Sequence, residues 1–289
     1  MSGLTPDELR ELRRIHVLAG RRVDSLLAGD YRSAVRGRGM EFEEVRGYVP
    51  GDDIRHIDWN VTARAGEPFI KVFREERQMT VQLVVDVSGS TRIGSGGPDG
   101  MTDRRRQIAR IAGGIAYAGI RNRDRVGLTT FTEAVETYLV PRAKRGHVWA
   151  VIQAVFEAKS GHRGTDLEAV ISFISRTQKR RAVIVLVSDF LDEGPWDRAL
   201  SRLARKHTVH AIMVTDPLDE GLRGLGLVDF VDAETGRTWT ADASRMNTPW
   251  TTSSRLKRLQ RAGARCVGIS TEDDPYTALA RHFQGQGRR

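Results

Sequence analysis

Oxygen-bearing side chains follow directly on two of the most apolar segments of the chain. TVQLVV and AVIVLV are followed at once by Asp or Ser residues, and the loop GTD lies between the two segments. The oxygen-bearing residues of these three segments are Asp86, Ser88 and Ser90, then Thr165 and Asp166, then Ser188 and Asp189. Carboxylates and hydroxyls suit a hard cation, since Mg²⁺ prefers about six oxygen ligands and usually retains some waters. The pattern therefore points to a divalent-cation site.

Other chemistries fit these residues less well. The chain contains no Gly-x-x-x-x-Gly-Lys-Ser/Thr for a phosphate loop, and Asp-Val-Ser-Gly-Ser is not the Gly-x-Ser-x-Gly of a serine hydrolase. An aspartyl phosphotransferase would place a second Asp where Ser88 stands. The plainest alternative is that the serines cap a loop and that Asp86 and Asp189 cap helices. Asp166, next to Thr165, is expected to cap a helix rather than to bind metal.

The candidate ligands are positioned by an alternation of strands and helices. Strands are expected over residues 80–87, 125–131, 135–140, 181–189, 208–216 and 265–270, and helices over 103–121, 146–158, 166–177, 196–206, 253–262 and from 275. A hairpin is expected around Glu234–Gly236. This is the pattern of an α/β fold with a doubly wound, mostly parallel sheet. In such sheets ligands gather at the carboxyl ends of the strands, so the three oxygen-rich loops are expected to converge.

The N-terminal part of the chain reads differently. Residues 5–27 predict an amphipathic helix. Residues 37–80, with their dense mix of Asp, Arg, His and Trp, are too polar for a core and too rich in aromatic and apolar residues for a linker. We expect two domains: residues 1–79, with the helix and a small β-containing module, and residues 80–289, with the sheet.

Composition limits the classes of partner. The formal net charge is +9 and the pI is about 10.2, yet the basic residues are dispersed and no aromatic platform accompanies them, which disfavours nucleic-acid binding. The single cysteine, Cys266, excludes an internal disulfide and fits a reducing compartment. No apolar run approaches the roughly 20 residues that span a bilayer. We therefore expect a cytoplasmic protein without a membrane span.

The five candidate ligands resemble the metal-ion-dependent adhesion site of von Willebrand factor A domains. That motif consists of Asp-x-Ser-x-Ser, a distant Thr and a later Asp, which match Asp86, Ser88, Ser90, Thr165 and Asp189. The resemblance implies a divalent cation, Mg²⁺ first, with Mn²⁺ or Ca²⁺ as alternatives. It also implies that an acidic side chain of a partner protein completes the metal's ligand shell.

The segment GRGMEFEEVRGYVPGDDIRHIDWNVTARAGEPFIKVFREE is similar to the bacterial domain of unknown function 58 family. The matching signature positions are Gly51, Asp52, Asp53, Arg55, Asp58, Trp59 and Arg64. In that family the segment precedes a von Willebrand A-like domain. The family is viewed as an adaptor or co-chaperone of MoxR-type AAA+ ATPases in complex assembly, maturation or stress responses. The signature residues either brace the module or form a second recognition surface.

These resemblances imply a metal-dependent protein-interaction module rather than an enzyme. The alternative is a hydrolase or phosphotransferase that uses the same strand-end pocket. That alternative needs a general base near the metal, and none is evident in these motifs.

Overall fold

The computed structural model describes residues 6–23, 41–74, 78–92, 103–158, 164–220, 227–231, 237–242 and 251–284. The chain divides into two compact units. The larger unit comprises residues 1–35 and 80–289, and the smaller comprises residues 36–79. Among the described residues, no helix combines the length and apolar character needed to cross a membrane.

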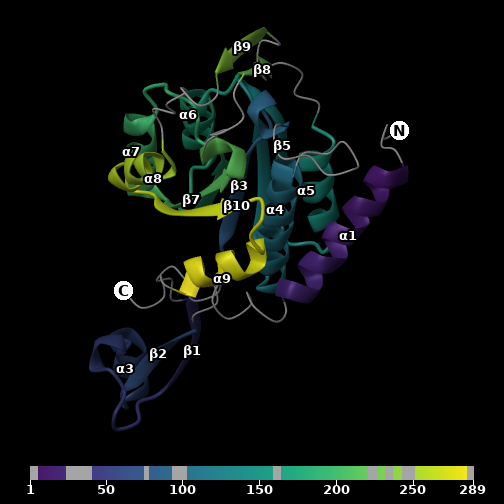
Figure 1. Cartoon of the computed structure of the whole chain (residues 1–289). Helices are drawn as coiled ribbons and strands as arrows, with labels where there is room; N and C mark the ends of the chain where they lie inside the picture. The colour runs from purple at the N-terminus through teal and green to yellow at the C-terminus, as the bar shows by residue number, and fades with distance from the viewer. Residues whose placement is uncertain are drawn as a thin grey trace. The chain divides into compact units, whose positions relative to one another are not determined.

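A six-stranded sheet forms the centre of the larger unit, in the order β10-β7-β6-β3-β4-β5. Its strands pair in parallel except for β5, which runs antiparallel to β4 (Figure 1). Strands β3, β6 and β7 are buried almost throughout, because their apolar runs face helices on both sides of the sheet. The predicted doubly wound, mostly parallel fold is confirmed. The strands are β3 (Thr80–Asp86), β4 (Arg125–Phe131), β5 (Val135–Arg142), β6 (Val183–Ser188), β7 (Thr208–Thr215) and β10 (Arg265–Ser270).

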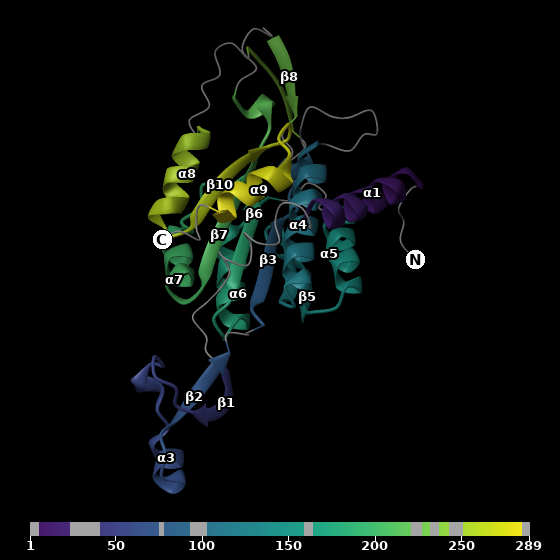
Figure 2. The same ribbon diagram turned by 90° about the horizontal axis from the view of Figure 1, so that it is seen from below.

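Helices cover both faces of this sheet (Figures 1 and 2). One face carries α4 (Asp103–Arg121), α5 (Gly146–Phe156) and α9 (Pro275–Gln284). The other carries α6 (Leu167–Thr177), α7 (Asp197–Lys206) and α8 (Thr252–Arg261). Strand β8 (Leu227–Val231) pairs antiparallel with β9 (Thr238–Asp242), as the predicted hairpin requires, and its predicted turn at residues 234–236 lies outside the described residues.

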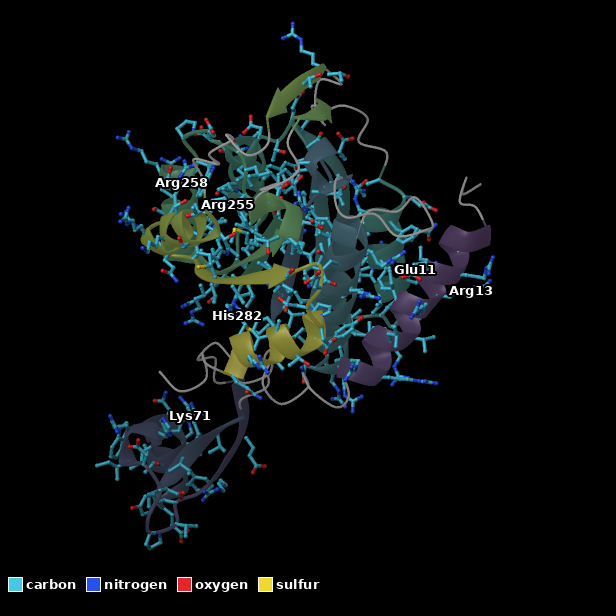
Figure 3. The ribbon with its side chains drawn as sticks, viewed as in Figure 1. Glu11, Arg13, Lys71, Arg255, Arg258 and His282 are labelled. Atoms are coloured by element: carbon cyan, nitrogen blue, oxygen red, sulfur yellow. The ribbon has the colours of Figure 1, made fainter. Side chains whose placement is uncertain are left out.

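Helix α1 (Pro6–Arg22) packs against α4 and α5, so it lies in the larger unit. Leu12, Ile15 and Ala19 form its buried stripe. Glu11, labelled in Figure 3, forms an ion pair with Arg106 of α4 at 3.3 Å. The division expected from the sequence places this helix with residues 1–79 instead.

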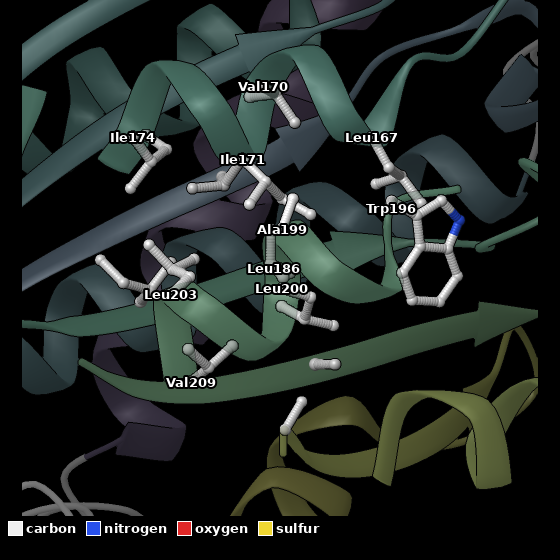
Figure 4. Packing of buried hydrophobic residues seen from close by; sticks show 14 of the residues in the cluster. Leu167, Val170, Ile171, Ile174, Leu186, Trp196, Ala199, Leu200, Leu203 and Val209 are labelled. Atoms are coloured by element: carbon white, nitrogen blue, oxygen red, sulfur yellow. The ribbon is translucent and has the colours of Figure 1, made fainter. Parts of the chain in front are cut away.

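A hydrophobic cluster lies between the sheet and helices α6 to α8 (Figure 4). Trp196 is its largest side chain, and its indole Nε1 donates to the carbonyl of Asp192 at 2.9 Å. The guanidinium of Arg258, on α8, lies 3.9 Å from the centre of the Trp196 ring and also binds Asp197. This packing fixes α7 and α8 on the sheet, and with them the loop after β6.

The smaller unit is a two-stranded antiparallel sheet with one short helix. It consists of β1 (Glu41–Gly47), the 3₁₀ turn η2 (Ile54–His56), α3 (Trp59–Ala65) and β2 (Phe69–Arg74). Asp58 caps α3 through the amides of Asn60 and Val61 and pairs with Lys71, labelled in Figure 3, at 3.2 Å. Asp58 therefore stabilises the smaller unit from within.

The remaining signature residues of the smaller unit divide into bonded and exposed groups. Asp52 accepts both guanidinium nitrogens of Arg46 at 2.8 Å, and Asp53 accepts from the backbone and side chain of Arg55. Gly51 has a φ of 109°, which favours glycine at that turn. Trp59 is 70% exposed and Arg64 is also exposed, so neither belongs to a core within this unit.

Two buried histidines of the larger unit predict a loss of stability in acid. His210 Nδ1 and His282 Nε2 lie 2.9 Å apart between β7 and α9 (Figure 3 labels His282). Burial, followed by the charges of neighbouring groups that include Arg265, lowers the pKa of His210 to about 3 and that of His282 to about 4. The unfolded chain takes up protons near pH 6.5 and the folded chain does not, so stability falls as the pH drops below about 6.5.

The expected loss between pH 8 and pH 5 is of order 2 kcal/mol for each histidine. Urea unfolding at both pH values checks it. The variant His282→Gln, whose amide can still bond His210, should lose about 2 kcal/mol less than the wild type over this range. Equal losses in the two proteins would show that the pair does not carry this pH dependence.

Candidate metal site

The candidate ligands lie at the carboxyl edge of the sheet, where the strand order changes direction. Strand β3 lies between β4 on one side and β6 on the other. Asp86 is the last residue of β3 and Asp189 follows directly after β6. The amide of Val87 donates to the carbonyl of Phe131 at 2.9 Å, which fixes this loop against the end of β4. The predicted convergence of β3 and β6 at one edge is therefore present.

Asp86 is fully buried and its two carboxylate oxygens have different partners. Oδ1 accepts the amide of Ser88 at 2.9 Å, and Oδ2 accepts the hydroxyl of Ser188 at 2.6 Å. Burial first, and then the negative charge of Asp189, raises the pKa of Asp86 to about 7. The ionised form of this carboxylate would therefore be stabilised by a positive charge bound beside it.

The two serines form a pair of adjacent hydroxyls. Ser88 Oγ and Ser90 Oγ lie 3.1 Å apart at the start of the 3₁₀ turn η3 (Gly89–Arg92). The hydroxyl of Thr91 donates to the carbonyl of Ser88 at 2.7 Å. Arg105, from α4, donates to the carbonyl of Val87 and to the hydroxyl of Thr91. These bonds hold the backbone of the loop, so the serine hydroxyls are positioned in advance.

Asp189 is buried between two arginines. Arg104 Nη1 lies 3.4 Å from Asp189 Oδ2 and 3.0 Å from the carbonyl of Ser90. Arg104 Nη2 donates to Asp219 Oδ1 at 2.5 Å. Arg255, labelled in Figure 3, donates to the carbonyl of Asp189 at 2.6 Å. The shorter bond of Arg104 goes to Asp219, so Asp189 Oδ2 keeps capacity to bind a cation.

Thr165 stands at the same edge, in the connection that leads into α6. The next residue, Asp166, donates its amide to the carbonyl of Thr132 at 3.1 Å, just beyond the end of β4. The carboxylate of Asp166 accepts the amide of Ala169 at 2.7 Å, which confirms it as the cap of α6. Thr165 is partly buried, and its role as a ligand stays a prediction.

The donor set fits a hard divalent cation. Two serine hydroxyls, two carboxylates and a threonine hydroxyl are the oxygen ligands that Mg²⁺ takes, with water in the remaining positions. In the part of the chain that the structure describes, no three His, Cys, Asp or Glu side chains gather as a metal cluster. The three hydroxyls add no negative charge, so only the two carboxylates would compensate the charge of the cation. A carboxylate from outside the chain could replace one of the waters in the remaining positions.

Arg104, Arg255 and Asp219 were not found from the sequence, whereas Ser188 was expected at this edge as part of the third oxygen-rich loop. Ser188 bonds Asp86, Arg104 and Arg255 bond Asp189, and Asp219 bonds Arg104. Ser188 stands next to Asp189, and Asp219 lies in the turn η4 (Pro217–Glu220) just beyond β7, so strand-end position was a usable signal for both. The two arginines lie in helices with several other arginines, and nothing in the sequence distinguishes them.

The parallel sheet with an added antiparallel edge strand, and the oxygen-rich loops after β3 and β6, define a von Willebrand factor A-like domain. Residues 44–258 match the family described as protein of unknown function DUF58, and the chain belongs to that family. A relative from Mycobacterium tuberculosis is 33% identical over 228 residues, which are 78% of this chain and 70% of the relative. A relative from Mycobacterium bovis matches to the same extent.

Solved structures are similar to the chain at low sequence identity. The conserved hypothetical protein BatB from Bacteroides thetaiotaomicron is 17% identical with a TM-score of 0.50, and the match covers 73% of this chain and 100% of BatB. Proximal thread matrix protein 1 from the mussel byssus, solved with zinc in its MIDAS motif, is 11% identical with a TM-score of 0.45. That match covers 72% of this chain and 48% of the mussel protein.

Proposed function

We propose that this chain is a metal-dependent protein-interaction module that works as an adaptor of a MoxR-type AAA+ ATPase. The observation that carries the proposal is the pairing of buried Asp86 and Asp189 with two adjacent serine hydroxyls at the strand-order switch. A bound Mg²⁺ would supply positive charge with an open coordination position. A carboxylate of the partner is the ligand that such a position takes best.

The chain's own residues prepare that position. Asp86, Ser88, Ser90, Thr165 and Asp189 would hold the cation, with Mn²⁺ or Ca²⁺ as alternatives to Mg²⁺. Ser188 orients the Asp86 carboxylate at 2.6 Å. Arg105 and Arg255 hold the backbone of Val87 and of Asp189. Arginines that fix the loop backbones keep the ligands in place when a partner binds or leaves.

Recognition is favoured over catalysis by the partners of these oxygens. The side chains that bond Asp86, Ser88 and Asp189 in the described structure are serines and Arg104. A metal-dependent hydrolase or phosphotransferase needs a general base within reach of an activated water. Arginine does not serve as that base, because it stays protonated, and Asp86 and Asp189 are ligands of the cation in this proposal. The proposal is therefore a binding protein, not an enzyme.

The test is capture of a purified MoxR-type ATPase on the immobilised chain, with Mg²⁺ or with EDTA. We expect capture in Mg²⁺ to fall at least about tenfold in EDTA, and to fall as far in Asp86→Ala with Mg²⁺ present. Asp166→Asn, which keeps the cap of α6, is the matched control and should bind as the wild type does. Equal capture with and without metal would exclude a metal-bridged contact.

A further inference from the structure

Basic residues gather at the amino edge of the sheet, which is opposite to the candidate metal site. Strands β3, β4, β6, β7 and β10 run parallel, so their first residues share one edge. Each of these strands except β3 follows a helix that ends at that edge: α4 precedes β4, α6 precedes β6, α7 precedes β7 and α8 precedes β10. The turn η4 and the β8–β9 hairpin lie between β7 and α8 in the chain. Strand β5 runs the other way and ends there, since Arg142 pairs with Val126.

On the β4 side of this edge, two connections carry exposed cations. The connection RNRDR, residues 121–125, has exposed arginines at its first, third and fifth positions. The segment RAKR, residues 142–145, has exposed basic side chains at every position except Ala143. Arg125 donates to the carbonyl of Pro141 at 3.4 Å, which places the two connections side by side.

On the β6 side, three further connections continue the row. They are RTQKRR (176–181), RKH (205–207) and RAGAR (261–265), and all of their Arg and Lys side chains are exposed. Lys206 donates to the carbonyl of Gln178 at 3.1 Å. Burial, followed by the charges of Lys206 and Arg181, lowers the pKa of His207 to about 4, so cations of two connections act on one histidine.

These five connections, which we call the basic edge, contain a single carboxylate. It belongs to Asp124 and is only 6% exposed. A helix dipole favours cations in the last turn of a helix, which accounts for Arg121, Arg176 and Arg261. It does not account for Arg180 or Arg265, which lie outside the helices. The basic edge therefore contains more basic residues than the helix ends alone would explain.

We infer that the basic edge binds the phosphodiester backbone of a nucleic acid without reading its sequence. With strands about 4.8 Å apart, the row from β10 to β5 is about 24 Å long. Along the axis of a double helix, that length spans roughly seven phosphates of each strand at about 3.4 Å each. Arginine, which predominates in the row, binds phosphate through two parallel hydrogen bonds.

A protein partner fits the basic edge less well. The centre of a protein–protein interface is built on buried aromatic and aliphatic anchors. Of the large apolar side chains that are exposed in the described structure, none lies within the five connections. The absence of aromatic platforms, which the sequence already showed, excludes base stacking rather than backbone contact. The basic residues are dispersed in the sequence, and only the parallel topology gathers them.

The test is fluorescence anisotropy of a labelled single-stranded DNA of about 20 nucleotides, between about 50 and 200 mM KCl. The variant Lys179→Gln/Arg180→Gln/Arg181→Gln should bind about tenfold more weakly at the lowest salt, with a slope against log salt that is shallower by about 2. The control Arg13→Gln/Arg198→Gln/Lys257→Gln removes the same charge from exposed positions outside the basic edge. It should stay within about twofold of the wild type.

Asp86→Ala should bind the DNA as the wild type does, so this result is separable from failure of the metal site. No binding at the lowest salt, or equal weakening by both triple variants, would overturn the inference. Tighter binding to poly-glutamate than to the DNA would assign the basic edge to an acidic protein instead. Tighter binding to phosphatidylserine vesicles would assign it to a membrane surface.

Discussion

The substitution Asp86→Asn is expected to stabilise the metal-free protein and to abolish its stabilisation by Mg²⁺. Asp86 is fully buried, and burial together with the charge of Asp189 raises its pKa to about 7. The unfolded chain ionises this carboxyl near pH 3.9. Stability of the metal-free protein therefore falls as the pH rises from about 4 to about 7, and the whole cost is present at pH 8.

An asparagine side chain at this position removes that cost and keeps the size of the group. We expect Asp86→Asn to be more stable than the wild type by an amount of order 2–4 kcal/mol in EDTA at pH 8. Mg²⁺ at about 100 times its Kd should stabilise the wild type by about 2.7 kcal/mol, because it binds only the folded chain. The variant lacks the charge that holds the cation, so it should gain almost nothing.

Urea unfolding of both proteins, in EDTA and in Mg²⁺, measures these four free energies. Asp166→Asn is the control, because it neutralises a carboxylate at the same edge that only caps α6. It should leave both the stability and the response to Mg²⁺ near those of the wild type. If Asp86→Asn is less stable than the wild type in EDTA, the charge of Asp86 is satisfied by the chain itself and the site does not require a cation.

The fold and most of the candidate site were predictable because both depend on local patterns. The apolar runs that become β3 and β6 are too continuous for one-sided strands, which already requires helices on both faces. Parallel strands bring their carboxyl ends to one edge, so Asp86 and Asp189 were expected to meet. Asp166 was separable from the ligands because a helix follows it directly.

The rest was not predictable because it depends on contacts between distant segments. Arg104, Asp189 and Asp219 come from α4, from the loop after β6 and from η4, and no spacing in the sequence links them. The basic edge could not be predicted from the sequence for the same reason. Its connections are separated by whole strands and helices, and only the strand order β10-β7-β6-β3-β4-β5 places them in one row.

The substitution Arg104→Gln is expected to destabilise the metal-free protein strongly and to increase its response to Mg²⁺. The side chain of Arg104 forms ion pairs with both Asp189 and Asp219. The exposed fractions of the three side chains are 3% for Arg104, 1% for Asp189 and 18% for Asp219. Removing one member of a buried charge pair costs about 3–5 kcal/mol, because the remaining charges lose their partner. Unfolding in EDTA should show a loss of this size.

A divalent cation can then replace the missing positive charge. The variant should bind Mg²⁺ at least about tenfold more tightly than the wild type, since a nearby cation no longer opposes it. Asp219→Asn should act in the opposite direction. It leaves Asp189 as the only carboxylate that Arg104 contacts in the described structure, so the arginine competes with the metal for Asp189 Oδ2.

Arg106→Gln is the matched control for this pair of variants. Arg106 lies two residues further along α4, and it forms an ion pair with Glu11 of α1 at 3.3 Å. It should lower stability equally in EDTA and in Mg²⁺. Isothermal titration with Mg²⁺ measures the affinity of each variant. If Arg104→Gln and Asp219→Asn shift this affinity in the same direction, Arg104 and the metal do not compete for Asp189. The arginine then serves only to hold the fold.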